Sequence, residues 1–268
     1  MTYETLLLDR ADRIATITFN RPQALNAVTA VMARELTDAL AVCSSDPETR
    51  VLVLTGAGRA FCAGEDVKER PADSAEIRAR STPLGKLMSG PGGHIHFAHT
   101  MRAMTKPTIA ALNGPAVGQG LSLALACDIR IASKDARLGA VWVRRGIPPE
   151  SAGAYLLTQL VGPAKACELI FTGRILEADQ AKEIGLVNSV VPAGQALDAA
   201  RALALEISQN APVAIGVAKM MTYQALETSL QVHGRMDFLG QEFCFNTSDR
   251  EEGIRSFLEK RPAEFTGS

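Results

Sequence analysis

The chain has 268 residues, of which 47% are hydrophobic and 21% are charged, and its formal net charge is -1. A chain of this length forms one large domain or one domain with an appended element, and this composition supports a packed core and excludes wholesale disorder. No block of basic residues dominates, so we expect no dedicated nucleic-acid surface.

Strand and helix patterns alternate in the first part of the chain. Apolar and polar residues alternate from Arg13 to Phe19, as in a half-buried strand. Thr29 is of the residue type that caps helix N-termini, and glycines follow the buried strands. We predict strands at 13–19, 50–55, 108–112 and 129–132, and helices at 29–40, 97–104 and 120–127. This alternation favours the α/β fold class.

The last part of the chain has a different pattern. After Pro192 the strand pattern stops, and helices are predicted at 195–209, 213–226 and 229–244. We therefore divide the chain into an α/β core over 1–192 and a helical region over 193–268. The polar segment 70–93 is rich in Arg, Ser, Pro and Gly, and we predict a mobile loop there that borders the functional site.

The N-terminus and the cysteines bear on the cellular compartment. Residues 1–10 contain no apolar run long enough for a signal peptide, and the longest apolar stretch, 121–126, is too short to cross a bilayer. The 5 cysteines are scattered and never form a Cys-x-x-Cys pair, which argues against disulfides and zinc. We expect a soluble, cytoplasmic protein with reduced thiols and no membrane partner.

Two segments place small residues between a buried strand and the start of a helix. The first is 58–69 (GRAFCAGEDVKE) and the second is 109–122 (IAALNGPAVGQGLS). Small residues let a ligand approach the main chain, and a helix start offers unpaired N–H groups at the positive end of the helix dipole. Two such N–H groups that converge on one oxygen would form an oxyanion hole. The alternative is that these glycines serve only tight turns and packing.

Together these segments resemble the two signature regions of the crotonase superfamily, also called the enoyl-CoA hydratase/isomerase family. Further matching segments extend the resemblance over nearly the whole chain: 20–26 (NRPQALN), 126–130 (ACDIR), 172–174 (TGR), 181–188 (AKEIGLVN) and 257–262 (FLEKRP). The resemblance implies a crotonase-type α/β spiral of ββα units, with a helical C-terminal region that packs subunits into homotrimers or into hexamers made of two trimers. It also implies an acyl-CoA thioester substrate, with coenzyme A as part of that substrate and no separate cofactor.

The resemblance also assigns roles to particular residues. It implies that the backbone N–H groups of Glu65 and Gln119 form the hole, at positions where the family commonly has Ala and Gly. It places these residues at the CoA and substrate groove: Gln23, Ala24, Ala63, Gly64, Asp66 and Lys68. Phe257 and Lys260 of a neighbouring subunit would reach the adenine end of CoA. For both lysines the alternative is a solvated surface side chain.

The proton carrier departs from the hydratase pattern. In that pattern two glutamates hold the attacking water, but the corresponding positions here are Ser122 and Trp142. Neither a serine hydroxyl nor an indole exchanges protons usefully near neutral pH. Glu150 stands where peroxisomal-type 3-enoyl-CoA to 2-enoyl-CoA isomerases carry a Pro-Glu pair and ring-modifying phenylacetate-pathway isomerases carry an Asp. The resemblance therefore favours Glu150 as the catalytic acid of a 3-enoyl to 2-enoyl isomerisation, whereas the alternative is a carboxylate that only stabilises a helix N-terminus.

Other functions stay open at this point. Trp142 precedes Glu150 by 8 residues, a spacing also found before the nucleophilic carboxylate of aryl-CoA dehalogenases, although we prefer the interpretation that Trp142 packs the wall of the acyl pocket. Hydration with a rearranged acid set, thioester hydrolysis and non-catalytic CoA binding are further alternatives. His94, His96 and His99 form a loose cluster, which we interpret as loop or pocket-wall histidines, and we predict no metal site.

Overall fold

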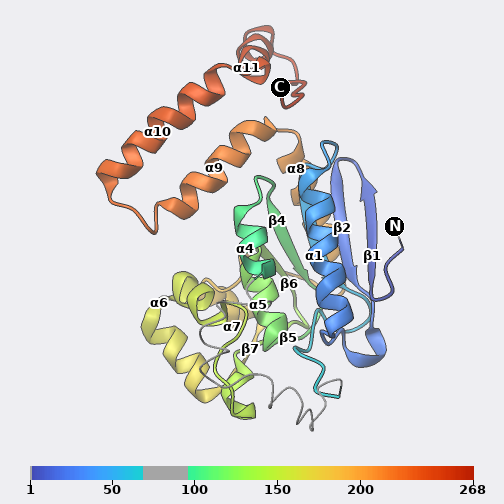
Figure 1. Cartoon of the computed structure of the whole chain (residues 1–268). Coiled ribbons are helices and arrows are strands. Elements are labelled where there is room, and N and C mark those ends of the chain that lie inside the picture. The colour runs from blue at the N-terminus through green and yellow to red at the C-terminus, as the bar shows by residue number, and fades with distance from the viewer. Residues whose placement is uncertain (1, 69–95) are drawn as a thin grey trace, which may run out of the picture.

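The computed structural model describes residues 2–68 and 96–268 (Figure 1), and the loop predicted at 70–93 lies outside them. The main sheet has six strands in the order β1-β2-β3-β4-β6-β9. β1 (Leu6–Ala11) pairs antiparallel with β2 (Ile14–Phe19), and the sheet continues in parallel through β3 (Val51–Gly56), β4 (Thr108–Leu112), β6 (Ile129–Ser133) and β9 (Ser189–Val191). A smaller sheet joins β5 (Ala116–Val117), β7 (Arg137–Gly139) and β8 (Ile175–Glu177).

The predicted strands and helices of the α/β region are confirmed. The strands are β2, β3, β4 and β6, and the helices are α1 (Ala30–Ser45), α4 (His96–Ala103) and α5 (Gln119–Ala126). β3 and β4 are buried along their whole length, as expected for parallel strands that are covered on both faces. Thr29 caps α1, because its side chain accepts a hydrogen bond from the Met32 N–H at 3.1 Å.

Helices cover both faces of the main sheet. On one face, α1, α4 and α5 share the larger apolar core with Leu54 of β3. On the other face, Ala200 and Ala204 of α8 (Ala196–Ser208) pack with Val53 and Ile109. Neighbouring residues of β3 thus point to opposite faces, as the pleat requires. α8 belongs to the layered core, although it lies in the predicted helical region of the sequence.

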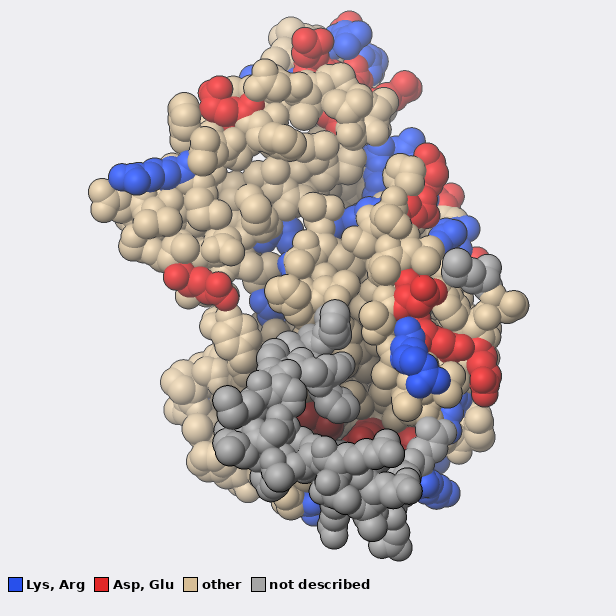
Figure 2. Space-filling view, viewed as in Figure 1, with Lys and Arg blue, Asp and Glu red and all other residues tan. Residues whose placement is uncertain are grey.

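The remaining C-terminal helices project from this core (Figure 1). They are α9 (Pro212–Gln224), α10 (Leu230–Phe245) and α11 (Ser248–Glu259), whereas α6 (Gly153–Thr172) and α7 (Ala178–Glu183) precede β9 in the chain. Exposed apolar side chains concentrate on α10 and α11: Leu230, Phe238, Leu239, Phe243, Ile254, Phe257 and Leu258. Figure 2 shows a largely uncharged surface over α9 and α10. Such a surface suits burial between subunits, and the homotrimer stays a prediction.

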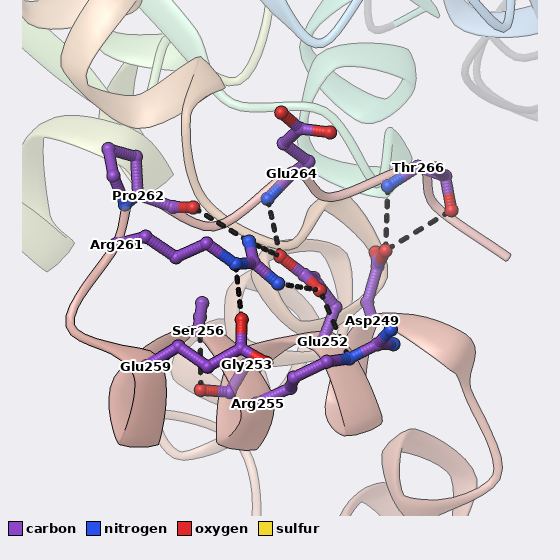
Figure 3. A network of polar contacts seen from close by, with 10 residues as sticks. All are labelled: Asp249, Glu252, Gly253, Arg255, Ser256, Glu259, Arg261, Pro262, Glu264 and Thr266. Carbon is purple, nitrogen blue, oxygen red and sulfur yellow. Dashed lines mark hydrogen bonds and ion pairs between the residues drawn. The ribbon is translucent and has the colours of Figure 1, made fainter.

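The C-terminal tail folds back onto α11 (Figure 3). The Arg261 guanidinium pairs with the Glu252 carboxylate at 2.6 Å, and the Thr266 N–H donates to Asp249 at 2.7 Å. The hydrogen bond from Arg261 lowers the pKa of Glu252 to about 2. These contacts fix the chain around Lys260, which ends α11 with a left-handed φ of 54°. Among the described helices, none combines the length and the apolar character that a bilayer span requires.

Candidate active site

The two glycine-containing segments lie side by side in the structure. Cys62 and Ala116 form a parallel β-bridge. The Cys62 N–H donates to the Pro115 carbonyl at 3.0 Å, and the Val117 N–H donates to the Cys62 carbonyl at 3.1 Å. These hydrogen bonds place residues 63–65 beside the start of α5.

Glycine is required where the two segments touch. A Cβ on Gly120 would lie 2.1 Å from the Cys62 carbonyl oxygen, which is a severe overlap. Gly64 has a φ of +97°, and a Cβ there would lie 3.1 Å from the Val117 oxygen and 3.6 Å from the Gln119 nitrogen. The glycines therefore do serve close packing, and this packing brings the Gln119 amide next to Gly64.

The Gln119 amide is oriented as a hydrogen-bond donor. Gln119 is the first residue of α5, so its N–H has no partner within the helix. Within residues 2–68 and 96–268, no backbone carbonyl accepts a hydrogen bond from it. The unusual backbone angles fall on the preceding Gly118, with φ 56° and ψ -124°, so Gln119 itself stays helical. The positive end of the helix dipole adds to the donor character of this amide.

The direction of the Glu65 amide follows from a second β-bridge. Glu65 pairs in parallel with Val28. The Val28 N–H donates to the Gly64 carbonyl at 2.8 Å, and the Asp66 N–H donates to the Val28 carbonyl at 2.9 Å. In this pairing pattern the N–H of Glu65 itself points away from Val28. Glu65 and Gln119 both line the same cavity.

This cavity has a volume of about 140 Å³ and brings together many of the predicted site residues. The predicted residues that line it are Ala63, Gly64, Glu65, Gln119, Trp142 and Glu150. Other lining residues were not among the predicted site residues: Val67, Gly118, Val141, Arg145 and Ile147. The cavity therefore combines two segments of main chain with two glutamates, Glu65 and Glu150, one arginine and several apolar residues.

The main chain of Glu150 is fixed from two sides. Its carbonyl accepts a hydrogen bond from the Ser122 hydroxyl at 2.9 Å and another from the Gly153 N–H at 2.8 Å. Ser151 and Ala152, which follow it, both have left-handed φ values of 54° and 61°. The half-buried side chain of Glu150 stands at the cavity wall, just before α6 begins.

Trp142 lines the cavity, and its contact with an acyl group stays a prediction. It lies in the short 3-10 helix η2 (Val141–Arg145) and is only 1% exposed. A Cβ on Gly153 would lie 2.7 Å from indole Cζ2, so the start of α6 lies directly against the ring. Among the described residues, no group forms a hydrogen bond with the indole N–H.

Comparison with known proteins agrees with this geometry. The family model for enoyl-CoA hydratase/isomerase matches residues 9–268. The chain belongs to the enoyl-CoA hydratase/isomerase family. A protein of Mycobacterium bovis named as a probable enoyl-CoA hydratase is 39% identical over 273 residues, which cover 99% of each chain. The crotonyl-CoA hydratase of Syntrophomonas wolfei is 34% identical over 266 residues, which also cover 99% of each chain.

A solved structure confirms the crotonase-type fold of this family member. The crystal structure of an enoyl-CoA hydratase from Bacillus anthracis matches with a TM-score of 0.91 at 34% identity. The match covers 99% of this chain and 100% of that one. The fold predicted from the motifs is therefore confirmed, together with the family.

Some of the predicted CoA-groove residues adjoin the cavity without lining it. Gln23 and Ala24 lie in the 3-10 helix η1 (Pro22–Ala24). The residue after η1, Leu25, accepts a hydrogen bond from the Ala63 N–H at 3.0 Å, so η1 lies next to the cavity loop. This placement is compatible with a groove for CoA, and the CoA contacts stay a prediction.

Asp66 is engaged within the chain. Its carboxylate accepts hydrogen bonds from the Arg21 guanidinium at 2.9 Å and from the Lys68 N–H at 3.1 Å. Burial alone would raise the pKa of Asp66, but the bonds from Arg21 and Lys68 lower it below its usual value. Asp66 thereby ties the cavity loop to η1, while the Lys68 side chain is exposed.

Phe257 and Lys260 lie far from the cavity of their own chain. Figure 1 shows α11 at one end of the molecule and β5 and β7 near the other. Phe257 is 82% exposed. Their predicted contact with CoA therefore requires a neighbouring subunit, and it stays a prediction.

Among the residues that the structure describes, no cysteine or histidine lines the cavity. All five cysteines are free, as predicted, and burial raises the pKa of Cys62 to about 12, so its thiol is a poor nucleophile. His94 lies outside the described residues, and His99 is exposed. Over 2–68 and 96–268, no three His, Cys, Asp or Glu side chains gather as a metal site would require. The absence of a metal stays a prediction.

Several larger cavities lie elsewhere, and two of them, of about 380 and 500 Å³, lie along α9. The second is lined by Lys219 and Asp128, whose side chains form an ion pair at 2.8 Å, and the Tyr223 hydroxyl donates to Asp128 at 2.6 Å. These contacts tie α9 to the core. Neither cavity is lined by Glu65, Gln119 or Glu150, so the smaller one is the candidate active site.

Proposed function

We propose that this chain is an acyl-CoA enzyme in which the backbone N–H groups of Glu65 and Gln119 stabilise a thioester enolate and Glu150 moves a proton. The observation that carries the proposal is that these three residues line one cavity of about 140 Å³. Two donors aimed at one oxygen favour the enolate over the ground-state thioester, because the negative charge on that oxygen develops only during the reaction.

The reaction we favour is isomerisation of a 3-enoyl-CoA to a 2-enoyl-CoA. The Glu150 carboxylate removes a proton from the carbon alpha to the thioester carbonyl, and the charge moves onto the carbonyl oxygen. The same carboxyl group then returns the proton two carbons away, and the double bond moves into conjugation. One carboxyl group suffices for both proton transfers. Of the two glutamates that line the cavity, Glu150 stands at the position used by isomerases of the family.

Hydration of a 2-enoyl-CoA is the second candidate. The relatives from Mycobacterium bovis and Syntrophomonas wolfei carry hydratase names, and this favours it. In this chain Ser122 and Trp142 occupy the positions of the two hydratase glutamates. Hydration would therefore use Glu150 to activate the water.

The CoA moiety would lie along η1 and the cavity loop. The main chain of Ala24 and Ala63 would lie along the CoA moiety. The exposed ammonium group of Lys68 is suited to pairing with a phosphate group of CoA. In a trimer, Phe257 and Lys260 of the next subunit would reach the adenine.

A substrate panel in D₂O tests the proposal. Purified protein is incubated with 3-enoyl-, 2-enoyl-, halogenated aromatic and saturated acyl-CoAs, and products are identified by mass. Isomerisation gives a 2-enoyl-CoA, recognised by the absorbance of its conjugated thioester, and the product carries deuterium to the extent that Glu150 exchanges its proton with solvent before returning it. Hydration adds one water, dehalogenation loses the halogen, and hydrolysis releases free CoA. The proposal fails if CoA thioesters bind without any conversion and without exchange of the alpha protons, because the protein would then be a non-catalytic CoA binder.

A further inference from the structure

An arginine on α4 lines the cavity of about 500 Å³ beside α9 without a carboxylate partner. The Arg102 guanidinium lies over the Tyr223 ring, with Cζ 3.9 Å from the ring centroid. The ring is itself fixed, because the Tyr223 hydroxyl donates to Asp128 at 2.6 Å. Arg102 Nε is buried, whereas its two terminal nitrogens keep contact with solvent, and among the described residues neither forms a hydrogen bond or an ion pair. The guanidinium is therefore held in place with two donor groups available to a ligand.

A second arginine, Arg130 on β6, brings a buried positive charge to the same cavity. Arg130 is 3% exposed, and its Nε and Nη1 donate to the main-chain carbonyls of Leu186 at 2.9 Å and Cys127 at 2.6 Å. Over 2–68 and 96–268, its guanidinium forms no ion pair with a carboxylate. Burial lowers the pKa of Arg130, and the positive charge of Arg102 lowers it further. A buried cation without a counter-charge is costly, so an anion in this cavity would stabilise it.

The acidic side chains near this cavity already have partners. Asp128 pairs with Lys219 at 2.8 Å and accepts a hydrogen bond from the Tyr223 hydroxyl. Glu227, just after α9, accepts a hydrogen bond from the Tyr155 hydroxyl at 2.7 Å. Three cationic side chains and one carboxylate thus line the cavity, and the two guanidinium groups have no counter-charge in the part of the chain that the structure describes. Figure 2 shows Lys and Arg atoms deep in the notch between α9 and α6.

Most of the remaining cavity surface is apolar. Leu160 of α6 faces Ile215 and Ala218 of α9 across it, and Leu226 lies at the end of α9. A volume of about 500 Å³ lies in the range of small-molecule sites. A guanidinium binds a carboxylate through two parallel hydrogen bonds, and apolar walls favour a hydrocarbon chain. A strongly hydrated polar ligand would leave these walls uncovered.

We propose that this cavity binds a monocarboxylic acid with an apolar chain, whose carboxylate pairs with Arg102 and whose chain lies between α6 and α9. The site is separate from the candidate active site, because neither Gln119 nor Glu150 lines it. The inference is therefore independent of the proposed function. Since α4, β6, α6 and α9 all contribute to the lining, a bound acid also stabilises the packing of α9 on the core.

Calorimetric titration of the full chain with octanoate tests the site. Octanol keeps the chain and removes the charge, and acetate keeps the charge and removes the chain. We expect octanoate to bind at least about tenfold more tightly than either. Arg102→Met removes the guanidinium and keeps an unbranched apolar side chain, so the affinity for octanoate should fall by about 10- to 100-fold. Ala218→Phe puts a ring at an exposed position of the cavity wall and should weaken octanoate binding while every charge is kept.

The matched control is Arg201→Met, the same chemical change on α8, where the arginine pairs with Asp9 at the surface. Its affinity for octanoate should stay within about twofold of the parent value. Circular dichroism checks that the variants fold, and Ala218→Phe tests the site independently should Arg102→Met misfold.

A second titration distinguishes this site from the candidate active site. Octanoate is added to the Glu150→Gln protein saturated with butyryl-CoA, which cannot be turned over there. Octanoate binding that persists with the same affinity supports a separate site. Displacement of octanoate by butyryl-CoA would place it in the candidate active site and overturn the proposal.

Other results overturn the site as well. Equal affinity for octanoate in the parent protein and in Arg102→Met would show that the guanidinium does not hold the carboxylate, and equal affinity for octanol would show apolar binding alone. If the parent protein does not bind octanoate, the site is refuted. Sedimentation then shows whether Arg102→Met weakens self-association, which would assign Arg102 to a contact with a carboxylate of a second copy.

Discussion

The two walls of the cavity differ in what they are made of. One wall is main chain: the peptides around Gly64 and Gly118, held together by β-bridges to neighbouring segments. The other wall is made of side chains between η2 and α6, among them Trp142 and Glu150. Under the proposed function, the first wall would supply the hole for negative charge whatever side chains surround it, and the second would decide which proton moves. Variants of the side-chain wall should therefore change the reaction, and variants of the main-chain wall should change the fold of the hole.

The largest effect is expected from Glu150→Gln on the side-chain wall. An amide cannot accept the alpha proton, so kcat should fall by about 10²- to 10⁴-fold while CoA binding is nearly unchanged. Turnover and CoA affinity are measured on the same preparation. Glu168→Gln, the same chemical change on the surface of α6, is the control and should keep full activity. Unchanged turnover in Glu150→Gln would remove Glu150 from the mechanism.

Gly120→Ala should separate the two main-chain segments that form the first wall. The new Cβ would lie 2.1 Å from the Cys62 carbonyl oxygen, so the two segments must move apart and the hole must widen. We expect a loss of about 1–3 kcal/mol in the free energy of unfolding, with a loss of activity in the protein that still folds. The matched change Gly234→Ala in α10 meets nothing within 4 Å and should be neutral or stabilise by up to about 1 kcal/mol. Urea unfolding measures both, and equal effects would show that the contact at Gly120 is unimportant.

Ser122→Ala tests the hydrogen bond that joins α5, on the main-chain wall, to Glu150 on the side-chain wall. It removes the hydrogen bond from the Ser122 hydroxyl to the Glu150 carbonyl, so Glu150 should be held less firmly and kcat should fall by less than about tenfold. Steady-state kinetics measure this change. A loss as large as that of Glu150→Gln would instead identify Ser122 as a proton carrier.

The smallest effect concerns the pH dependence of stability. Because the folded-state pKa of Asp66 lies below its usual value of 3.8, its ion pair with Arg21 stabilises the fold fully above that value and is lost as the pH falls through the lowered pKa. Asp66→Asn should therefore cost about 1 kcal/mol near neutral pH and nothing at the acid end. Chemical unfolding of both proteins from pH 7 to pH 2 checks this. A constant difference over the whole range would rule out the ion pair as the cause.

The sequence predicted the central strands well because they are continuous apolar runs, but it missed elements with weaker patterns. The edge strand β1 was not predicted, since only one face is covered and Leu7 is 52% exposed. A helix after Glu150 was expected and is found as α6, but its length was not predicted, because Gly162, with a φ of 76°, and Pro163 interrupt it. The position of α8 on the sheet depends on long-range packing of small residues such as Ala200, which no local pattern reveals.

The site was predictable to the extent that it rests on motifs. The glycine segments identified the main-chain wall, and the position of Glu150 in the family pattern placed it at the cavity. The positions of Val141 and Ile147 at the cavity were not predicted, because an apolar residue that lines a cavity cannot be distinguished in the sequence from a core residue. The engagement of Asp66 by Arg21 depends on a contact between residues 45 positions apart in the chain.

The hydrogen bond between Ser122 and the Glu150 carbonyl limits how the site can be redesigned. Ser122 is fully buried, and a Cβ on Gly153 would lie only 2.7 Å from its hydroxyl, so a larger side chain does not fit there. A glutamate at position 122 would therefore displace the turn that carries Glu150. Installing the two-glutamate arrangement in this chain thus requires compensating changes around Gly153 and not a single substitution.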